Sequence, residues 1–219
     1  MRVVIAGGHG KIALRLEKLL TEQGHQAVGL IRSEQQIGDV TATGAVAELC
    51  DLEKASVEDV TATLTDADAV VFAAGAGPGS GAERKKTVDR DAAILLAHAA
   101  IAAGVERYVM VSAMGADAPP TPDTEPVFAA YLRAKTEADE YLMSCEDLRW
   151  TILRPGGLTE EPGTGTVALA EHTGRGSIPR DDVAAVLAAL LVDSRTAGLT
   201  LELIAGTTAI RQAVEAVTG

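Results

Sequence analysis

Three side chains in the second half of the sequence could together move a proton to or from an oxygen atom. Ser112 follows an apolar run, and Tyr131 and Lys135 stand four residues apart, a spacing that places two side chains on one face of a helix. A neighbouring ammonium group favours the phenolate and is expected to lower the pKa of Tyr131, while a serine hydroxyl can hold a substrate oxygen. These residues are the catalytic candidates for a carbonyl/alcohol pair. Alternatively, Tyr131 and Lys135 are an exposed pair on a helix with no catalytic role.

A glycine-rich turn near the start of the sequence has the composition of a phosphate-binding loop. The apolar run 2–6 leads into Gly7-Gly8-His9-Gly10-Lys11-Ile12-Ala13, and leucines at helical spacing follow. Glycines permit a tight turn that leaves the backbone open to a pyrophosphate, and the N–H groups of the next helix point at the anion. An ordinary glycine-rich turn is the alternative, and His9 could face the ligand or solvent. The residues predicted to bind a dinucleotide here are Gly7, Gly8, His9, Gly10, Lys11 and Ile12.

The end of the second apolar run bears on which dinucleotide would bind. Arg32 and Ser33 stand where NAD-selective folds usually carry an acidic residue for the ribose hydroxyls. A guanidinium can hold a 2′-phosphate through two hydrogen bonds, and Ser33 can add a hydroxyl. The sequence therefore predicts NADP(H) as the cofactor and makes NAD(H) less favoured. Alternatively, Arg32 is a surface residue at the end of a strand and does not bind the cofactor.

The residues that follow the third and fourth apolar runs are predicted to line the cofactor. Asp51 and Leu52 follow the third apolar run, where the carboxylate could meet the adenine amino group. Ala73, Ala74 and Gly75 follow the fourth, where small side chains would let the cofactor pass closely.

Apolar runs and helical patterns alternate along the chain and predict how these residues are positioned. Most runs are continuously apolar, as in parallel strands that helices cover on both faces. The predicted strands are 2–6, 27–31, 45–49, 69–73, 108–111, 150–153 and 199–204, and the predicted helices are 11–23, 57–64, 86–103, 128–144, 181–192 and 208–217. This order predicts an α/β fold with a doubly wound parallel sheet, a Rossmann fold, as a single domain over 1–219. The irregular stretches 75–81, 116–126 and 158–176 follow strands, where ligands bind in such sheets.

Composition and charge exclude several classes of protein. With 47% hydrophobic and 23% charged residues the chain is globular, and its net charge of −12 disfavours nucleic acid and anionic membranes as partners. Cys50 and Cys145 suggest neither a disulfide framework nor a metal site. We therefore expect the protein in the reducing cytoplasm. No apolar run approaches the length of a membrane span. We expect a small-molecule substrate, no metal, and a monomer or homodimer.

Taken together, these motifs make the whole chain resemble the short-chain dehydrogenase/reductase superfamily. The resemblance is to its small atypical NAD(P)-binding members, described as NAD-dependent epimerase/dehydratase-like, near the NmrA-like and biliverdin-reductase-B-like groups. It rests on residues 7–10, 69–75, 111–115 and 151–158, and on Tyr131 with Lys135. The resemblance implies that Ser112 orients substrate, Tyr131 is the acid/base, and Lys135 tunes it and holds the nicotinamide ribose. It also implies a short substrate cleft around 155–180 and a nicotinamide end lined by Pro155, Gly156, Gly157 and Leu158.

The sequence departs from this family at three places. Ala13 replaces the third glycine of the turn, the segment after Pro155 lacks the sugar-binding lobe of nucleotide-sugar epimerases, and Asp89 stands where many members carry an asparagine that shapes a proton relay. The retained serine, tyrosine and lysine favour an NADP(H)-dependent oxidoreductase acting on a small carbonyl or alcohol. The alternatives are a non-catalytic NADP(H)-sensing module of the NmrA-like kind and an epimerase or isomerase that uses transient oxidation.

Overall fold

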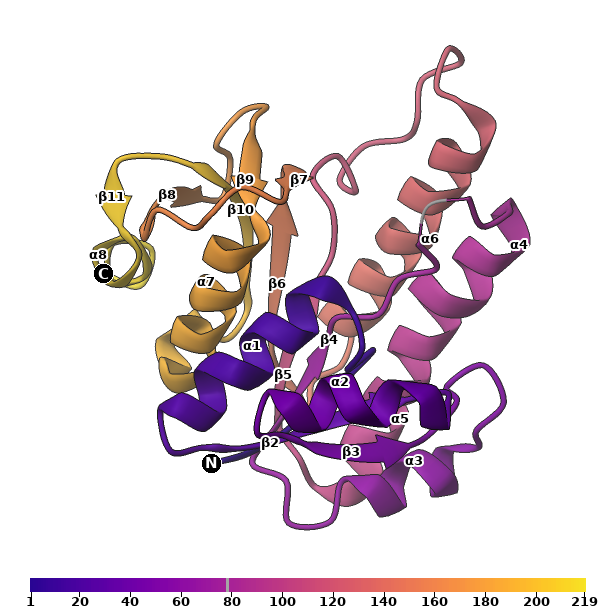
Figure 1. The fold of residues 1–219 in the computed structure, drawn as a ribbon. Helices are drawn as coiled ribbons and strands as arrows, with labels where there is room; N and C mark the ends of the chain where they lie inside the picture. The colour runs from indigo at the N-terminus through magenta and orange to yellow at the C-terminus, as the bar shows by residue number, and fades with distance from the viewer. Residues whose placement is uncertain (78) are drawn as a thin grey trace.

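Apolar strands build the middle of the molecule. In the computed structural model, which describes residues 1–77 and 79–219, one nine-stranded sheet runs through the fold and seven of its strands are parallel (Figure 1). In order across the sheet, these seven are β3 (Val46–Leu49), β2 (Gln26–Ile31), β1 (Arg2–Ala6), β4 (Ala69–Phe72), β5 (Arg107–Val111), β6 (Arg149–Pro155) and β10 (Leu199–Ala205). The predicted doubly wound sheet is confirmed.

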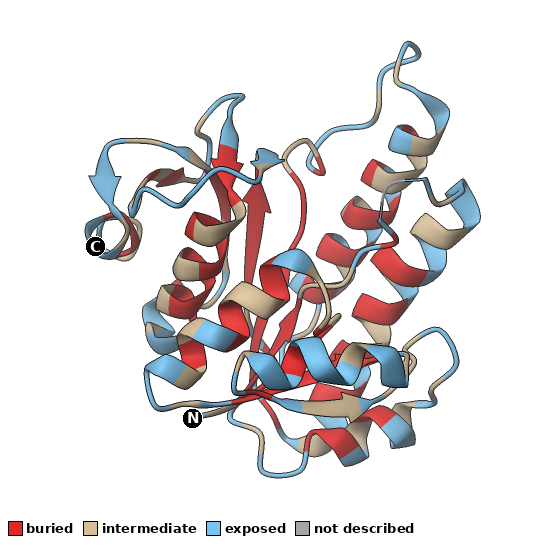
Figure 2. Cartoon of the chain, viewed as in Figure 1, coloured by how far each residue is buried: buried red, intermediate tan, exposed pale blue. Residues whose placement is uncertain are grey.

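Each face of the sheet has its own aliphatic core, because successive strand residues point to opposite faces. In β1, Val3 and Ile5 belong to one buried cluster and Val4 and Ala6 to the other. Helices cover both clusters, which explains why the central strands β1 and β4 are continuously apolar rather than alternating (Figure 2). One face carries α1 (Lys11–Glu22), α2 (Ile37–Ala42) and α7 (Arg180–Val192), and the other carries α3 (Val57–Thr63), α5 (Ala92–Ala103) and α6 (Pro126–Met143).

The start of α6 is fixed by its sequence. The Glu125 carboxylate accepts hydrogen bonds from the backbone N–H groups of Val127 and Phe128, and Pro126 occupies the first turn, where its missing N–H costs nothing. Helical geometry then brings Tyr131 and Lys135 onto one face of α6, as their spacing predicted.

The order of the strands reverses between β1 and β4. After β1 the chain adds β2 and β3 on one side, then returns to pair β4 with the other edge of β1. The connections that leave β1 and β4 therefore diverge at the carboxyl ends of the two strands, which is where open α/β sheets bind ligands. The glycine turn follows β1 and the segment 73–77 follows β4, so both lie at this position.

Short edge elements were not predicted from the sequence. The predicted irregular stretch 158–176 holds most of β7 (Gly157–Thr159) and all of β8 (Thr166–Ala170). β8 lies antiparallel to β10, β11 (Thr208–Ala209) lies antiparallel to β8, and β7 pairs in parallel with β9 (Ser177–Pro179). The predicted helix over 208–217 was wrong at its first two residues, because they pair as β11. These strands have two to five residues, too few to produce a clear period in the sequence.

Helical segments also differ from the predicted ones. The predicted helix 86–103 is a π-helix, η2 (Lys85–Asp91), that continues as α5, and α5 ends at Gly104 in the left-handed conformation with φ 71°. The remaining elements are η1 (Glu34–Gln36), α4 (Ala82–Arg84), η3 (Ser194–Thr196) and α8 (Ile210–Ala216). Among the residues that the structure describes, no helix combines the length and apolar character needed to cross a membrane.

Candidate functional site

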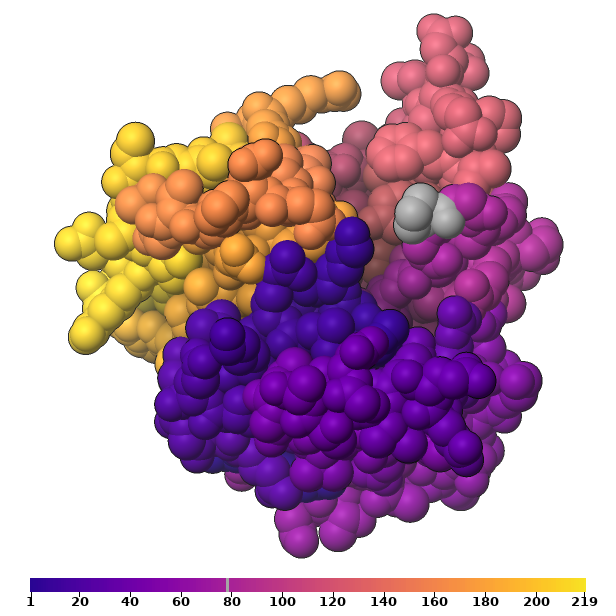
Figure 3. Space-filling view, viewed as in Figure 1, coloured from indigo at the N-terminus to yellow at the C-terminus, as the bar shows by residue number. Residues whose placement is uncertain are grey.

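Two cavities meet at the carboxyl ends of β1 and β4. The first has a volume of about 280 Å³ and lies toward β2 and β3, and the second, of about 750 Å³, lies toward β5 and β6. Gly10 and residues 73–77 line both cavities, so the two form neighbouring halves of one site. The space-filling view shows the surface hollowed between the indigo N-terminal segment and the pink segment that carries α6 (Figure 3).

The glycine turn has the geometry that a pyrophosphate needs. Gly7 has φ 79°, and a Cβ added there would lie 2.6 Å from Ala74 Cα, so no other residue fits. Helix α1 begins at the turn without a side-chain cap, which leaves the first N–H groups of the helix without a side-chain acceptor. Lys11 and Ile12, in that first turn, line the second cavity. The turn therefore fits an anionic group held by backbone donors.

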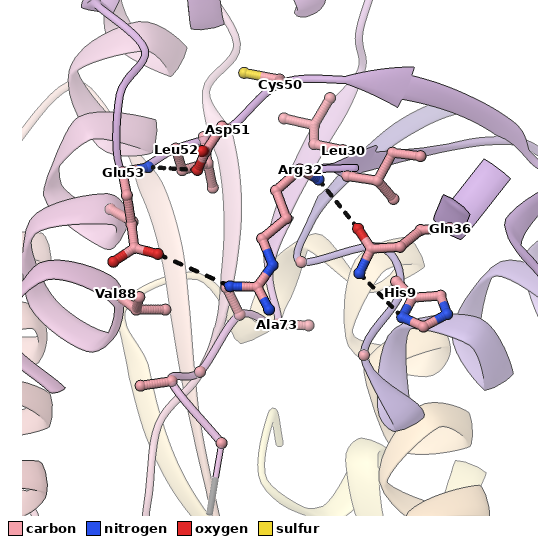
Figure 4. Close-up of a pocket in the computed structure, with 18 of the residues that line it drawn as sticks. His9, Leu30, Arg32, Gln36, Cys50, Asp51, Leu52, Glu53, Ala73 and Val88 are labelled. Atoms are coloured by element: carbon pink, nitrogen blue, oxygen red, sulfur yellow. Dashed lines mark hydrogen bonds and ion pairs between the residues drawn. The ribbon is translucent and has the colours of Figure 1, made fainter. Parts of the chain in front are cut away.

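Arg32 extends from the end of β2 into the first cavity. Its guanidinium points across the cavity toward Glu53, with Nη1 4.0 Å from Glu53 Oε2 (Figure 4). The side chain is 54% exposed, so it is free to meet a ligand. Asp51, Leu52, Ala73, Ala74 and Gly75 line the same cavity.

His9 links the glycine turn to the segment after β2. One ring nitrogen lies 2.7 Å from Asp39 Oδ2 and the other 3.2 Å from Gln36 Nε2, and His9 also lines the first cavity. Two predicted cofactor residues are absent from the walls that the described residues form. Gly8 packs against Gly29, and a Cβ added to Gly8 would lie 2.5 Å from Gly29 Cα. The Ser33 hydroxyl donates a hydrogen bond to the Gln35 side chain.

Asp51 carries its own counter-ion. Its carboxylate lies 2.8 Å from Lys54 Nζ, and this hydrogen bond holds the pKa of Asp51 below its ordinary value. The carboxylate is therefore ionised at neutral pH and is available as an acceptor in the first cavity.

Ser112, Tyr131 and Lys135 all line the second cavity. Ser112 follows β5 at its carboxyl end, and α6 brings the other two side chains beside it. Lys135 Nζ lies 5.9 Å from the centre of the Tyr131 ring. Residues 155–158 line the same cavity. The structure thus gathers the three catalytic candidates with the segment expected at the nicotinamide end.

Lys135 is a buried lysine with a buried counter-ion. Its Nζ donates to the Val111 carbonyl at 3.1 Å and lies 3.4 Å from Asp89 Oδ1, while Asp89 Oδ2 accepts from the Ala76 N–H at 3.2 Å. Asp89 comes from the π-helix η2, whose widened turn is a feature common at functional sites. The aspartate that departs from the family pattern therefore balances the charge of Lys135.

The expected effect of Lys135 on Tyr131 was wrong for this structure. The pKa of Tyr131 is raised, first by its burial and then by the negative charges of Asp89 and Asp139. The charge of Lys135 is compensated by Asp89, which explains why it does not stabilise a phenolate. Among the described residues the Tyr131 hydroxyl forms no hydrogen bond, and Tyr131 faces the cavity as a protonated phenol at neutral pH.

A buried acid lies behind Ser112. Both Arg154 Nε and Nη2 lie 2.9 Å from Asp139 Oδ2, so Arg154 and Asp139 form a buried ion pair. Burial raises the pKa of Asp139, and the nearby Ser112 hydroxyl and Arg154 lower it in part. Within the described chain, Ser112 Oγ and Asp139 Oδ1 complete no hydrogen bond with protein atoms. Ser112 lines the second cavity, and its hydroxyl is buried beside the Asp139 carboxylate.

Several lining residues were not predicted from the sequence. Apolar side chains and cations from segments far apart in the chain complete the second cavity, and an acid and an arginine complete the first. They are Met114, Phe128, Leu132, Lys85, Arg175 and Arg180 in the second cavity, and Glu53 and Arg84 in the first. The basic run 84–86 is visible in the sequence, but nothing in its spacing indicates which cavity it reaches.

The fold also gathers three possible metal ligands away from these cavities. Asp117, His172 and Glu202 each offer a ligand atom within 4.8 Å of the others, a grouping that sequence spacing does not reveal. Glu202 Oε2 already accepts a hydrogen bond from the Thr173 N–H at 2.7 Å.

Comparisons with known proteins agree with the geometry of this site. A family described as NAD(P)H-binding matches residues 7–194. A Bacillus subtilis protein named uncharacterized sugar epimerase YhfK is 37% identical over 216 residues, which cover 98% of this chain and 99% of that protein. A Bacillus halodurans protein, described as a proposed NAD-dependent epimerase/dehydratase, has a solved structure that matches with a TM-score of 0.91 and 36% identity. The match covers 99% of this chain and 100% of that one. The Lactococcus lactis oxidoreductase ylbE has a TM-score of 0.85 and 28% identity, covering 99% and 96%.

Proposed function

Because the chain belongs to the NAD(P)H-binding family, we propose that it is an NADP(H)-dependent oxidoreductase. It transfers hydride between nicotinamide and a small carbonyl or alcohol, and Tyr131 gives or takes the proton. The observation that carries the proposal is that Ser112, Tyr131 and Lys135 line one cavity, which shares Gly10 with the cavity that Arg32 enters.

The proposed cofactor site follows the two cavities. The backbone of Gly7, Gly10, Lys11 and Ile12 holds the pyrophosphate, and residues 155–158 lie along the nicotinamide. The remaining proposed contacts come from His9, Arg32, Asp51, Leu52, Ala73, Ala74 and Gly75, whereas Gly8 and Ser33, which line neither cavity, are left out. When bound, the nicotinamide supplies or accepts the hydride.

The chain's own residues handle the substrate oxygen and its proton. Tyr131 is protonated at neutral pH, since its pKa is raised, and this state favours the reductive direction, in which the phenol donates to the oxygen of a carbonyl. Ser112, which lines the same cavity, offers its hydroxyl to that oxygen. Lys135 orients the nicotinamide ribose, and Asp89 keeps the ammonium group in place.

The proposed substrate is small and partly apolar. The second cavity, of about 750 Å³, is shared between the nicotinamide end and the substrate, which leaves limited room for the latter. Its walls include the apolar side chains of Met114, Phe128 and Leu158, with Phe128 51% exposed and facing no core. A sugar nucleotide would need a lobe that the short segment after Pro155 does not supply.

An epimerase that works by transient oxidation is the second candidate. It is favoured by the names of two relatives, a sugar epimerase and an epimerase/dehydratase. Such an enzyme would use Tyr131 first as base and then as acid, and it would return the cofactor to its starting state.

A cofactor and substrate screen tests the proposal. Thermal shift with NADPH and NADH should detect stabilisation, which follows from binding to the native state. NADPH oxidation is then measured against aldehydes, ketones and diketones, and net oxidation of NADPH is expected with at least one small carbonyl. Epimerisation without net oxidation would favour the second candidate. Cofactor binding with no turnover of any kind would contradict an enzyme and favour the sensing module.

A further inference from the structure

Glu53 places a fixed negative charge inside the first cavity. Its Oε2 accepts from Arg84 Nη2 at 2.7 Å and Nε at 3.2 Å, and its Oε1 accepts from the Thr87 hydroxyl at 2.9 Å. The side chain is 27% exposed, and the hydrogen bond from Arg84 holds the pKa of Glu53 below its ordinary value. The carboxylate is therefore ionised at neutral pH and held in one position by two side chains.

Arg32 faces this carboxylate from the opposite wall. The two groups are 4.0 Å apart, which is at the limit of an ion pair, and Arg32 is the more exposed partner (Figure 4). Arg84 donates the short hydrogen bonds to Glu53, so Arg32 is not the main partner of this carboxylate. One side of the cavity thus offers a guanidinium to a ligand, and the other offers a carboxylate.

These two groups favour different cofactors. A guanidinium binds the 2′-phosphate of NADP(H), whereas a carboxylate accepts hydrogen bonds from the ribose hydroxyls of NAD(H). A phosphate held by Arg32 would bring at least one negative charge close to Glu53, and like charges at such distances lower affinity. Thr87 and Arg84 prevent the carboxylate from turning away.

We propose that Glu53 is a specificity-determining residue, whose carboxylate weakens binding of the 2′-phosphate and supports the ribose hydroxyls. Selectivity between NADP(H) and NAD(H) is then the balance of Arg32 against Glu53. This inference rests on the proposed function, because it requires that the adenosine end of a nicotinamide cofactor binds in the first cavity.

Isothermal titration calorimetry with NADPH and NADH tests the proposal on the full chain. Glu53→Gln removes the charge and keeps an acceptor for Arg84, so NADPH affinity should rise about tenfold while NADH affinity stays equal or falls. The ratio of the two affinities should therefore rise tenfold or more. Higher salt should shrink this gain, because salt screens repulsion between partly exposed charges.

Three further variants make the result specific. Glu53→Ala should raise the ratio like Glu53→Gln, and it serves if the glutamine variant fails to fold. Glu53→Asp keeps the charge and should leave the ratio within about threefold of wild type. Glu58→Gln removes one negative charge from an exposed position on α3 outside both cavities and should leave the ratio unchanged.

The outcomes separate this inference from the function on which it rests. Tight binding of both cofactors with an unchanged ratio in Glu53→Gln and Glu53→Ala would overturn the role of Glu53 and leave the proposed function intact. Failure of wild type to bind either cofactor would contradict the proposed function itself.

Discussion

Lys135 and Asp89 form a buried ion pair beneath the second cavity, with Nζ 3.4 Å from Oδ1 and exposed fractions of 2% and 1%. The pair links α6 to the π-helix η2 and fixes the ammonium group beside the Tyr131 ring. It also keeps a negative charge near Tyr131, which is one reason why the pKa of that phenol is raised. The state of the candidate acid is therefore set by the partner of the lysine as much as by the lysine.

Asp89→Asn should lower the stability of the fold and the pKa of Tyr131. The asparagine can still accept from the Ala76 N–H, but it leaves Lys135 buried without a counter-ion, which typically costs about 3 kcal/mol. Removal of the negative charge should also lower the pKa of Tyr131. Urea unfolding and ultraviolet titration measure the two effects. Unchanged stability together with an unchanged tyrosine titration would contradict the role given to the ion pair.

The tyrosines of the folded protein should resist ionisation. The pKa of each of the three tyrosines, Tyr108, Tyr131 and Tyr141, is raised, and burial is the first cause in each case. We therefore expect almost no phenolate absorbance below about pH 10 in the cofactor-free protein. A group that titrates near neutral pH in wild type and is missing in Tyr131→Phe would mean that Lys135 does activate the phenol.

Glu17 should make stability fall as pH rises. It is fully buried in α1, and burial raises its pKa to about 8 although the Thr43 hydroxyl lowers it slightly. The native state holds a proton that the unfolded chain releases near pH 4.5, so the stabilisation is complete below that pH and is lost up to about pH 8. The loss is of the order of 5 kcal/mol.

Glu17→Gln isolates this effect, since the amide has no proton to release. Urea unfolding at about pH 5 and about pH 9 should give a smaller loss of stability for the variant than for wild type. Parallel pH dependence of the two proteins would show that Glu17 is not the group responsible.

Arg32→Glu should reverse the preference between cofactors. If charge-assisted hydrogen bonds to the 2′-phosphate contribute roughly 1.4 to 3 kcal/mol, wild type should favour NADPH by ten- to hundredfold. The variant replaces attraction by repulsion and offers a second acceptor for ribose hydroxyls. Calorimetry with both cofactors measures the change, and equal affinities in wild type would remove Arg32 from this role.

Much of the fold could be predicted from the sequence because its strands are continuously apolar and its helices carry clear spacing. The sequence predicts all seven parallel strands, and it also predicts that Ser112, Tyr131 and Lys135 share one site. The edge strands β8 and β11 could not be predicted, because five and two residues are too few to show a clear period. Their pairing depends on β10, a tertiary neighbour that sequence does not identify.

The electrostatics of the site could not be predicted either. Sequence spacing joins Tyr131 to Lys135 but says nothing of Asp89 or Asp139, which reach the same place from η2 and from one turn further along α6. Glu53 and Arg84 are similarly distant in sequence and meet only because α4 follows the end of β4. The sign of a pKa shift depends on such contacts and on burial, and neither is encoded in local spacing.

Tyr131→Phe tests whether Tyr131 gives its proton to a substrate oxygen beside the nicotinamide. The variant keeps the ring stacked near Phe128 and deletes the transferable proton. With the carbonyl substrate that the screen identifies, NADPH affinity should change less than about threefold while kcat falls roughly 10²- to 10⁴-fold. A Tyr131→Phe enzyme with wild-type kcat and wild-type NADPH affinity would contradict this role of Tyr131.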